Sequence, residues 1–475
     1  MFRRPRRAFR HVRIVIAALL ALGGAAACNS GESGEGAPRA SVQKNVQIGE
    51  ETPEALIRVS SSPVLAVNPR DPENYVVGYR IELPAYSCGV AASFDGGMSW
   101  VPGRLDLPPD TERCYTTSLD FDRTGALHLV FVTLAGAGNV PAGVWATSSG
   151  DGGRTFAPAA LVLDDEKFMV RLAIDSTASP SRIFLTWVEA AGVGFLQMSP
   201  PSVVMMAVSN DGGATFGPPV QVSAAHRDRV GAPVPVAGQK GSVTVVYYDY
   251  RKDAFDFQNI EGVYDGTFEL VASRSTDGGA TFTESTIEGA VRPPEPFLVF
   301  TPPFPGAVSD SKGNLYVVWS DARLGSPAVF LAVSRDGGSR WGTPVRVDAG
   351  GEAALLPQVA AARSGRVDVI YAAVGSGAER PTTVRFTSSD DDGRTFGPVT
   401  ALNEPYRRDW LPANPRPGTE GDLGSTLALL SLPESAYAVW PDSRRGGSDV
   451  LRVDLVGAPV ALTADGNRRT PAAAQ

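Results

Sequence analysis

An eight-residue pattern recurs six times along the chain, and it constrains the fold more than any other feature. The pattern reads S-x-D-x-G-x-[TS]-[FW], and a clear copy is Ser275–Phe282. Five copies match it fully, whereas Ser334–Trp341 carries Arg340 at the hydroxyl position. The aspartates are Asp95, Asp151, Asp211, Asp277, Asp336 and Asp391, with separations of 56, 60, 66, 59 and 55 residues. A period of this length indicates a fold built from repeated structural units.

Each copy has the chemistry of a tight turn between two strands. Glycine tolerates positive φ at no steric cost, and a short aspartate side chain accepts hydrogen bonds from nearby backbone amides. The terminal aromatic residue is large and apolar, so we expect it to bury between layers. The six aspartates are therefore predicted to be structural.

The six copies resemble the Asp-box, or bacterial neuraminidase repeat, of the sialidase superfamily. The resemblance implies a β-propeller in which the box joins the third and fourth strands of each blade, away from the active face. Two β-branched runs precede each box, such as Arg171–Asp175 and Ile183–Trp187. Four antiparallel strands per repeat is the pattern of a propeller blade.

A seventh repeat without a box occupies the C-terminal part of the chain. Ser425–Leu430, Ser435–Arg444 and Asp449–Leu455 supply three strands. Asn45–Gly49 resembles the fourth strand Pro219–Ser223, so we expect it to complete the last blade and remove an open sheet edge. The predicted fold class is all-β: a seven-bladed β-propeller of four-stranded antiparallel blades, with a six-bladed propeller as the alternative.

The N-terminus has the pattern of an export signal. Six arginines up to Arg13 precede the apolar run Ile14–Leu22, and small residues then lead to Cys28. The segment resembles a bacterial lipoprotein signal, which implies acylation of Cys28; the alternative is an ordinary secretory peptide. We predict a signal peptide at 1–27, a flexible tether at 28–44, a propeller at 45–457 and a disordered tail at 458–475. The protein is then exported and held at the cell envelope by its lipid anchor only.

Composition excludes several classes of function. The net charge of −8 has no block structure after the N-terminus, so a nucleic-acid partner is not expected. Two histidines, two cysteines and no zinc-binding spacing remain after cleavage, so we expect no metal or other cofactor and a monomeric protein. Cys88 and Cys114 either pair in the oxidising compartment or remain separate thiols.

Candidate binding residues follow the second strand of several repeats. The motif [WY]-x-D-x-R puts an aspartate and an arginine on the same side of an extended chain. The candidates for substrate binding are Arg80, Arg251, Arg323, Arg444, Asp249, Asp321 and Asp442. In one interpretation the arginines bind a carboxylate, and in the other each Asp–Arg pair ties blades together.

The resemblance to sialidases also suggests a chemistry. Sialidases use three arginines on the substrate carboxylate, a tyrosine nucleophile paired with a glutamate, and an aspartic acid/base. Their Arg-Ile-Pro motif is absent here, and Arg58–Pro63 is a poor substitute, so the catalytic set cannot be mapped by position. The candidate catalytic residues are Tyr250, Tyr264, Tyr406 and Glu295.

Two functional hypotheses follow. The first is a sialidase-like hydrolase or binding protein that acts on glycans or a surface polymer at its axial face. The second is a non-catalytic scaffold for protein or polymer partners. Three arginines converging in one pocket beside a Tyr–Glu hydrogen bond favour the first, and arginines that are all paired with aspartates favour the second.

Overall fold

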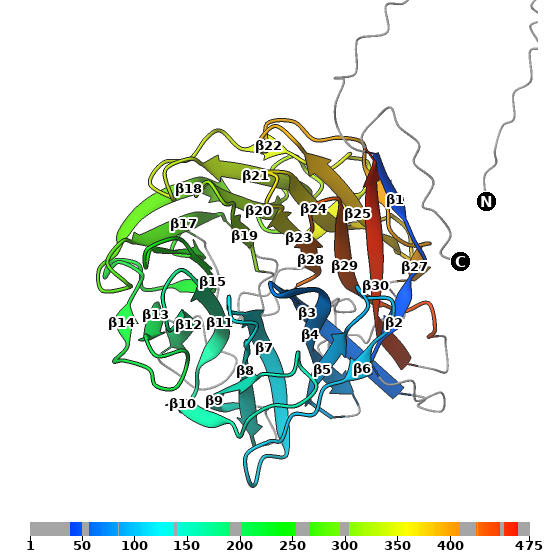
Figure 1. Ribbon diagram of the computed structural model, residues 1–475. Coiled ribbons are helices and arrows are strands. Elements are labelled where there is room, and N and C mark those ends of the chain that lie inside the picture. Colours follow the sequence, from blue (N-terminus) through cyan, green and yellow to red (C-terminus); the bar gives the residue numbers. More distant parts are fainter. Residues whose placement is uncertain are drawn as a thin grey trace, which may run out of the picture. The chain divides into compact units, whose positions relative to one another are not determined.

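The computed structural model describes residues 39–49, 57–83, 85–136, 140–190, 201–252, 266–294, 304–407, 424, 426–446 and 451–463 (Figure 1). The chain divides into units 1–35 and 36–475, and every described residue belongs to the second unit. All regular secondary structure among the described residues is β-strand. The all-β prediction is confirmed, and the strands form repeated four-stranded antiparallel sheets in a propeller-like arrangement.

Five sheets repeat the same order of strands, and we number them as groups 2 to 6 in chain order. Group 2 contains β7 (Arg113–Phe121), β8 (Leu127–Ala135), β9 (Val140–Ser149) and β10 (Ala160–Asp164). Group 3 contains β11 (Phe168–Asp175), β12 (Arg182–Ala190), β13 (Ser202–Ser209) and β14 (Val220–Gln221). Group 4 contains β15 (Val230–Ala237), β16 (Val243–Asp249), β17 (Phe268–Ser275) and β18 (Thr283–Val291).

The next two sheets have the same order. Group 5 contains β19 (Gly306–Ser309), β20 (Leu315–Asp321), β21 (Ala328–Ser334) and β22 (Val345–Arg346). Group 6 contains β23 (Ala353–Ala361), β24 (Val367–Val374), β25 (Pro381–Ser389) and β26 (Thr400–Ala401), and β27 (Tyr406–Arg407) also pairs with β25.

The two ends of the described chain meet in one larger sheet. Group 1 contains β3 (Ile57–Asn68), β4 (Asp71–Leu83), β5 (Ser87–Ser93) and β6 (Val101–Pro102). Group 7 contains β28 (Ala428–Ser431), β29 (Ser435–Asp442) and β30 (Leu451–Thr463), together with β1 (Arg39–Val42) and β2 (Val46–Ile48). Both β1 and β2 pair antiparallel with β30, and a short parallel pairing of β3 with β30 joins the two groups.

The last strand differs from the predicted boundaries. The prediction placed a tail from residue 458 and a tether up to residue 44, but β30 continues to Thr463 and pairs with β1. The reason is that Ala458 and Val460 are fully buried and continue the alternation of a half-buried strand.

The apolar core lies between neighbouring groups. One cluster joins Phe268 of group 4 to Trp319 of group 5, and another joins Phe386 of group 6 to Trp440 of group 7. The first strands contact one another in succession through β3, β7, β11, β15, β19, β23 and β28, and β28 contacts β3. Burial between sheets, proportional to apolar area, is therefore the main stabilising term.

The six repeated motifs connect the third strand to the fourth strand in groups 1 to 6. In each, the serine hydroxyl donates to the aspartate Oδ1 at 2.7–2.8 Å and accepts at 2.8–2.9 Å from the amide of the glycine two residues after the aspartate. This glycine is called the second glycine, because all copies except Ser389–Phe396 have another glycine before it. The same Oδ1 accepts the amide four residues on at 2.9–3.0 Å. In five copies a Thr or Ser hydroxyl adds a bond to Oδ2 at 2.5–2.7 Å.

These bonds favour the charged aspartate. The hydroxyl and amide of Thr215, with further help from Ser209, lower the pKa of Asp211 to about 2. Because folding lowers this pKa, the turn contributes its full stability above a pH of about 4 and loses it as the pH falls through about 2.

The turns also hold neighbouring groups together. The second glycine has φ between +79° and +96°, and a Cβ there would lie 2.2–3.4 Å from a side chain of the preceding group. At Gly97 that neighbour is Tyr437, and at Gly153 it is Val76. The terminal aromatic residue is half-buried and reaches the same way: the Trp341 indole N–H donates to the Ser285 hydroxyl at 3.0 Å.

Substituting Gly153 by alanine should destabilise the fold by about 2 kcal/mol, because the new Cβ meets Val76 at 2.7 Å and φ is +92°. Gly150→Ala is the matched control in the same turn, since no atom lies within 4 Å of its Cβ position. Chemical denaturation of the two variants measures the difference. Equal stability would contradict the role of the second glycine in packing the groups together.

Candidate functional site

The three repeated Asp–Arg pairs each lie in a different group and are closed by their own ion pair. Arg251 Nη2 lies 2.7 Å from Asp249 Oδ2, Arg444 Nη2 lies 2.7 Å from Asp442 Oδ2, and Arg323 pairs with Asp321. The aspartate side chains are at most 3 % exposed, whereas the arginines are about one third exposed. A buried carboxylate needs such a partner. Each of these three arginines is therefore engaged by its own aspartate, and this pairing favours the structural interpretation.

The predicted catalytic tyrosines that the structure describes are buried. Tyr250 is 0 % exposed and packs edge-on against Phe268 with ring centroids 5.3 Å apart, and Tyr406 is 2 % exposed in the core between groups 6 and 7. Neither side chain reaches solvent, because the chain turns each ring into the interface between sheets. Tyr264 and Glu295 lie outside the described residues, as does Cys28.

The remaining predicted arginine, Arg80, is not part of an Asp–Arg motif and instead interacts with residues of neighbouring groups. Arg80 on β4 interacts electrostatically with Tyr115 on β7, and Tyr115 also interacts with Arg171 on β11. Groups 1, 2 and 3 thus each contribute one residue from a first or second strand. We call Arg80, Tyr115 and Arg171 the arginine cluster.

The two arginines of this cluster are held in different ways. Arg80 Nη2 lies 2.7 Å from Glu82 Oε1. Arg171 donates to the backbone carbonyl of Thr117 and stacks on the Phe304 ring, with Cζ 4.0 Å from its centroid. Among the described residues, Arg171 has no carboxylate within ion-pair distance, unlike the other candidate arginines.

Electrostatics at the cluster reflect this excess of positive charge. Burial lowers the pKa of Arg171 to about 10; the charge of Arg80 acts in the same direction, and Tyr115 opposes it. Burial likewise raises the pKa of Tyr115 to about 12, although Arg80 and Arg171 pull it down. Both shifts are caused mainly by burial, and an anion placed here would stabilise the charged form of Arg171.

The first strands that carry Tyr115 and Arg171 are each interrupted by a bulge, as are the first strands of groups 1, 4 and 6. The β7–β8 ladder shifts register between Thr116 and Ser118, and the β11–β12 ladder shifts between Phe168 and Arg171, where Met169 has φ +56°. Such bulges redirect neighbouring side chains and cluster near functional sites. Sequence reasoning missed Arg171 and Tyr115; the available signal for Arg171 was a long cationic residue directly before the apolar run Leu172–Ile174.

A second charged cluster lies inside group 4, where Arg227, Arg251 and Lys252 face three carboxylates. Arg227 pairs with Asp249, with Glu269 Oε2 at 2.6 Å and with Glu284 Oε2 at 2.9 Å, so three successive strands each present one carboxylate. Tyr247 donates to Glu284 Oε1 at 2.5 Å. Burial, reinforced by this bond, raises the pKa of Tyr247. This Tyr–Glu pair is the type sought for catalysis, but Tyr247 is 0 % exposed, so its role is structural.

A disulfide joins two of the groups, and the described residues contain no metal-binding cluster and no membrane-spanning helix. Cys88 on β5 and Cys114 on β7 form a disulfide that joins groups 1 and 2. Within the described ranges, no group of three or more His, Cys, Asp or Glu side chains is arranged to hold a metal ion. No helix long and apolar enough to cross a membrane is found in that same part of the chain.

Comparison with known proteins shows the fold alone. No protein-family model and no curated protein sequence matches the chain. A structure of a protein of unknown function from Dyadobacter fermentans aligns over 89 % of this chain and 99 % of its own, with 12 % identity and a TM-score of 0.51. A phage phi92 endosialidase aligns over 91 % and 71 %, with 12 % identity and a TM-score of 0.49. A PL25 ulvan lyase aligns over 87 % and 95 %, with 11 % identity and a TM-score of 0.49.

Arg227→Ala should destabilise the protein by about 3 kcal/mol or more, because it leaves three carboxylates without their shared cation. Arg104→Ala is the control: Arg104 is 79 % exposed and pairs with Asp106, which is 71 % exposed, so its loss should cost less than about 1 kcal/mol. Denaturant unfolding of both variants at pH 7 makes the comparison. A loss below 1 kcal/mol for Arg227→Ala would rule out the proposed structural role of this cluster.

Proposed function

We propose that the chain is an exported propeller that binds an acidic glycan through its carboxylate at the arginine cluster. The observation that carries the proposal is Arg171, a poorly hydrated guanidinium with no carboxylate partner among the described residues. Arginine recognises carboxylates with paired hydrogen bonds in a fixed planar geometry. The guanidinium groups of Arg171 and Arg80 would supply the charge, and the Phe304 and Tyr115 rings would supply apolar surface for the sugar.

Recognition is proposed in preference to hydrolysis. A sialidase-like reaction needs a tyrosine activated by a carboxylate, and no hydrogen bond joins Tyr115 to a carboxylate within the described part of the chain. The sialidase Arg-Ile-Pro motif is also missing from the sequence. Binding without turnover is consistent with the absence of a Tyr115–carboxylate bond among the described residues and with the absence of the Arg-Ile-Pro motif.

We further propose that the seven strand groups are seven blades of a closed propeller and that the six turns are Asp-boxes. The succession of first-strand contacts, ending with β28 against β3, supports closure. The pairing of β1 and β2 with β30 supports an N-terminal contribution to the last blade. Such closure would leave no free edge on this sheet for pairing with another chain.

Export and anchoring through Cys28 are part of the same proposal and rest on the arginine-rich start, the apolar run and the small residues before Cys28. Cys28→Ser should abolish acylation and move the protein from the membrane fraction to the soluble fraction. Mass spectrometry of the mature N-terminus checks this directly. A wild-type protein cleaved at another position, with no lipid on Cys28, would show that the segment is an ordinary secretory signal.

The binding site is tested by titrating the folded protein, residues 30–475, with sialic acid, glucuronic acid and neutral glucose. We expect the acidic sugars to bind and Arg171→Ala to weaken that binding at least tenfold, because a charge-assisted interaction is lost. Arg346→Ala is a control far from the cluster in sequence and should leave the affinity unchanged.

A fluorogenic sialoside distinguishes binding from catalysis in the same preparation. Turnover that depends on Arg171 would replace recognition with hydrolysis as the function of the cluster. No binding of any acidic sugar, or equal binding by Arg171→Ala, would remove the arginine cluster as a glycan site.

A further inference from the structure

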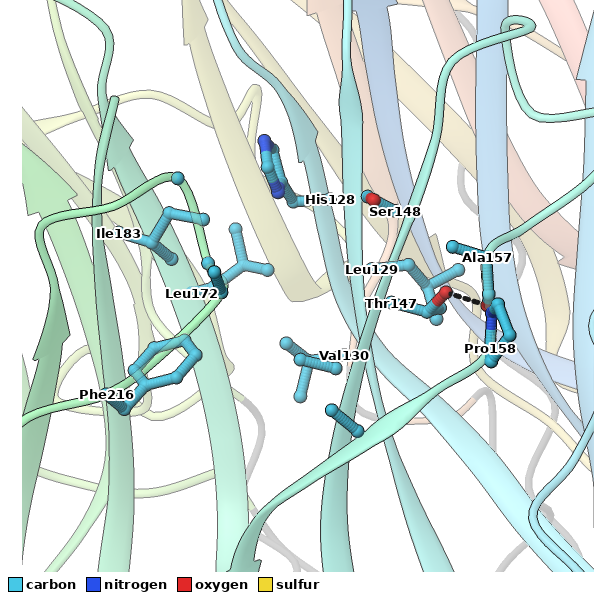
Figure 2. A pocket seen from close by; sticks show the side chains of 15 residues that line it. His128, Leu129, Val130, Thr147, Ser148, Ala157, Pro158, Leu172, Ile183 and Phe216 are labelled. Carbon is cyan, nitrogen blue, oxygen red and sulfur yellow. Dashed lines mark hydrogen bonds between the residues drawn. The ribbon is translucent and has the colours of Figure 1, made fainter. Parts of the chain in front are cut away.

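A cavity lies between groups 2 and 3, separate from the arginine cluster. Its volume is about 260 Å³. Figure 2 shows Val130, Leu172, Ile183 and Phe216 around it, with His128 and Ser148 along one side. Ala157, Pro158, Ala160 and Ala214 line it and are exposed, so the cavity opens to solvent.

The cavity lies where two small residues face a phenylalanine ring. In four of the interfaces, a cross-strand pair from the third and fourth strands of one group meets the aromatic residue that ends the next turn. The combinations are Met206–Val220 with Phe282, Leu331–Val345 with Phe396, Ala272–Ser285 with Trp341, and Ala146–Ala160 with Phe216. Larger pairs meet phenylalanine, and the small Ala–Ser pair meets tryptophan. Between groups 2 and 3, a small pair meets phenylalanine, and the missing volume remains open.

The polar side of the cavity is a buried, neutral imidazole. His128 is 8 % exposed, and its Nε2 lies 3.6 Å from Asp122 Oδ2, beyond normal hydrogen-bond length. Its Nδ1 faces Gly213 of the next group. Burial lowers the pKa of His128 and outweighs the opposing effect of Asp122, which also accepts a bond from Ser181 at 3.3 Å. The ring is therefore uncharged near pH 7 and offers a weakly satisfied polar edge.

We propose that this cavity binds a small, neutral, planar aromatic molecule that packs on Phe216 and places one polar group toward His128. Apolar cavities of about 150 Å³ bind benzene, so this one has room for a ring with a substituent. Mostly apolar walls with a few polar groups are typical of small-molecule sites. A charged ligand does not fit, because the lining residues carry no compensating charge.

Phenol is the probe, titrated into the protein by calorimetry or ligand-observed NMR. We expect saturable binding with a dissociation constant of about 1 mM or lower. Ala146→Met fills the cavity as Met206 does in group 3, so it should abolish binding and raise the melting temperature by about 1–3 °C. Ala160→Val fills the neighbouring position on the same wall and gives a second variant if Ala146→Met is poorly folded.

The control is Ala272→Met, the same position in group 4, where Trp341 already fills the space. This variant should lower the melting temperature by overpacking yet leave phenol affinity unchanged. Absence of saturable binding up to about 10 mM phenol, or unchanged affinity in the cavity-filling variants, would overturn the proposal. Neither result bears on the arginine cluster, because the acidic-sugar titration measures that site separately.

Discussion

Packing of each turn against the preceding group of strands is the interaction on which the rest of the structure depends. A single motif performs two tasks: the aspartate fixes the turn through its own hydrogen bonds, and the second glycine and aromatic residue contact the neighbouring sheet. Glycine is required there for conformation and for space together, which explains why the motif tolerates Arg340 at the hydroxyl position but keeps glycine in all six copies. The residues that fix each turn therefore also hold neighbouring repeats together.

Pairing of buried carboxylates with arginines is common in the structure, and the candidate site differs from this pattern. Six of the nine buried aspartates among the described residues have an arginine partner, as in the Asp321–Arg323 pair and at Asp249 beside Arg227. Such pairs stabilise mainly by avoiding the cost of an unpaired buried charge. Arg171 departs from this pattern, since its described contacts are backbone carbonyls and the Phe304 ring. An anion supplied from outside the chain would complete its coordination.

Much of the fold could be predicted from the sequence, because the repeated motif is local: its turn chemistry places the third and fourth strands, and alternation places the first two. The candidate site could not be predicted equally well. The convergence of Arg80, Tyr115 and Arg171 depends on contacts among three groups, which a pattern of period two does not reveal. Contacts between groups also decide the burial of Tyr250 and Tyr406. The sequence placed both tyrosines in connecting segments but could not show that their rings pack between sheets. The disulfide joins residues 26 apart, and sequence alone left its formation open.

The central claim is that a desolvated arginine cluster recognises a carboxylate. Calorimetric titration with an acidic sugar and with its carboxamide tests it most directly, because the two ligands share size and hydroxyl groups and differ in charge. The arginine cluster predicts that the acid binds at least tenfold more tightly, since only the charged group can neutralise Arg171. Equal affinity for acid and carboxamide would contradict carboxylate recognition at Arg80, Tyr115 and Arg171.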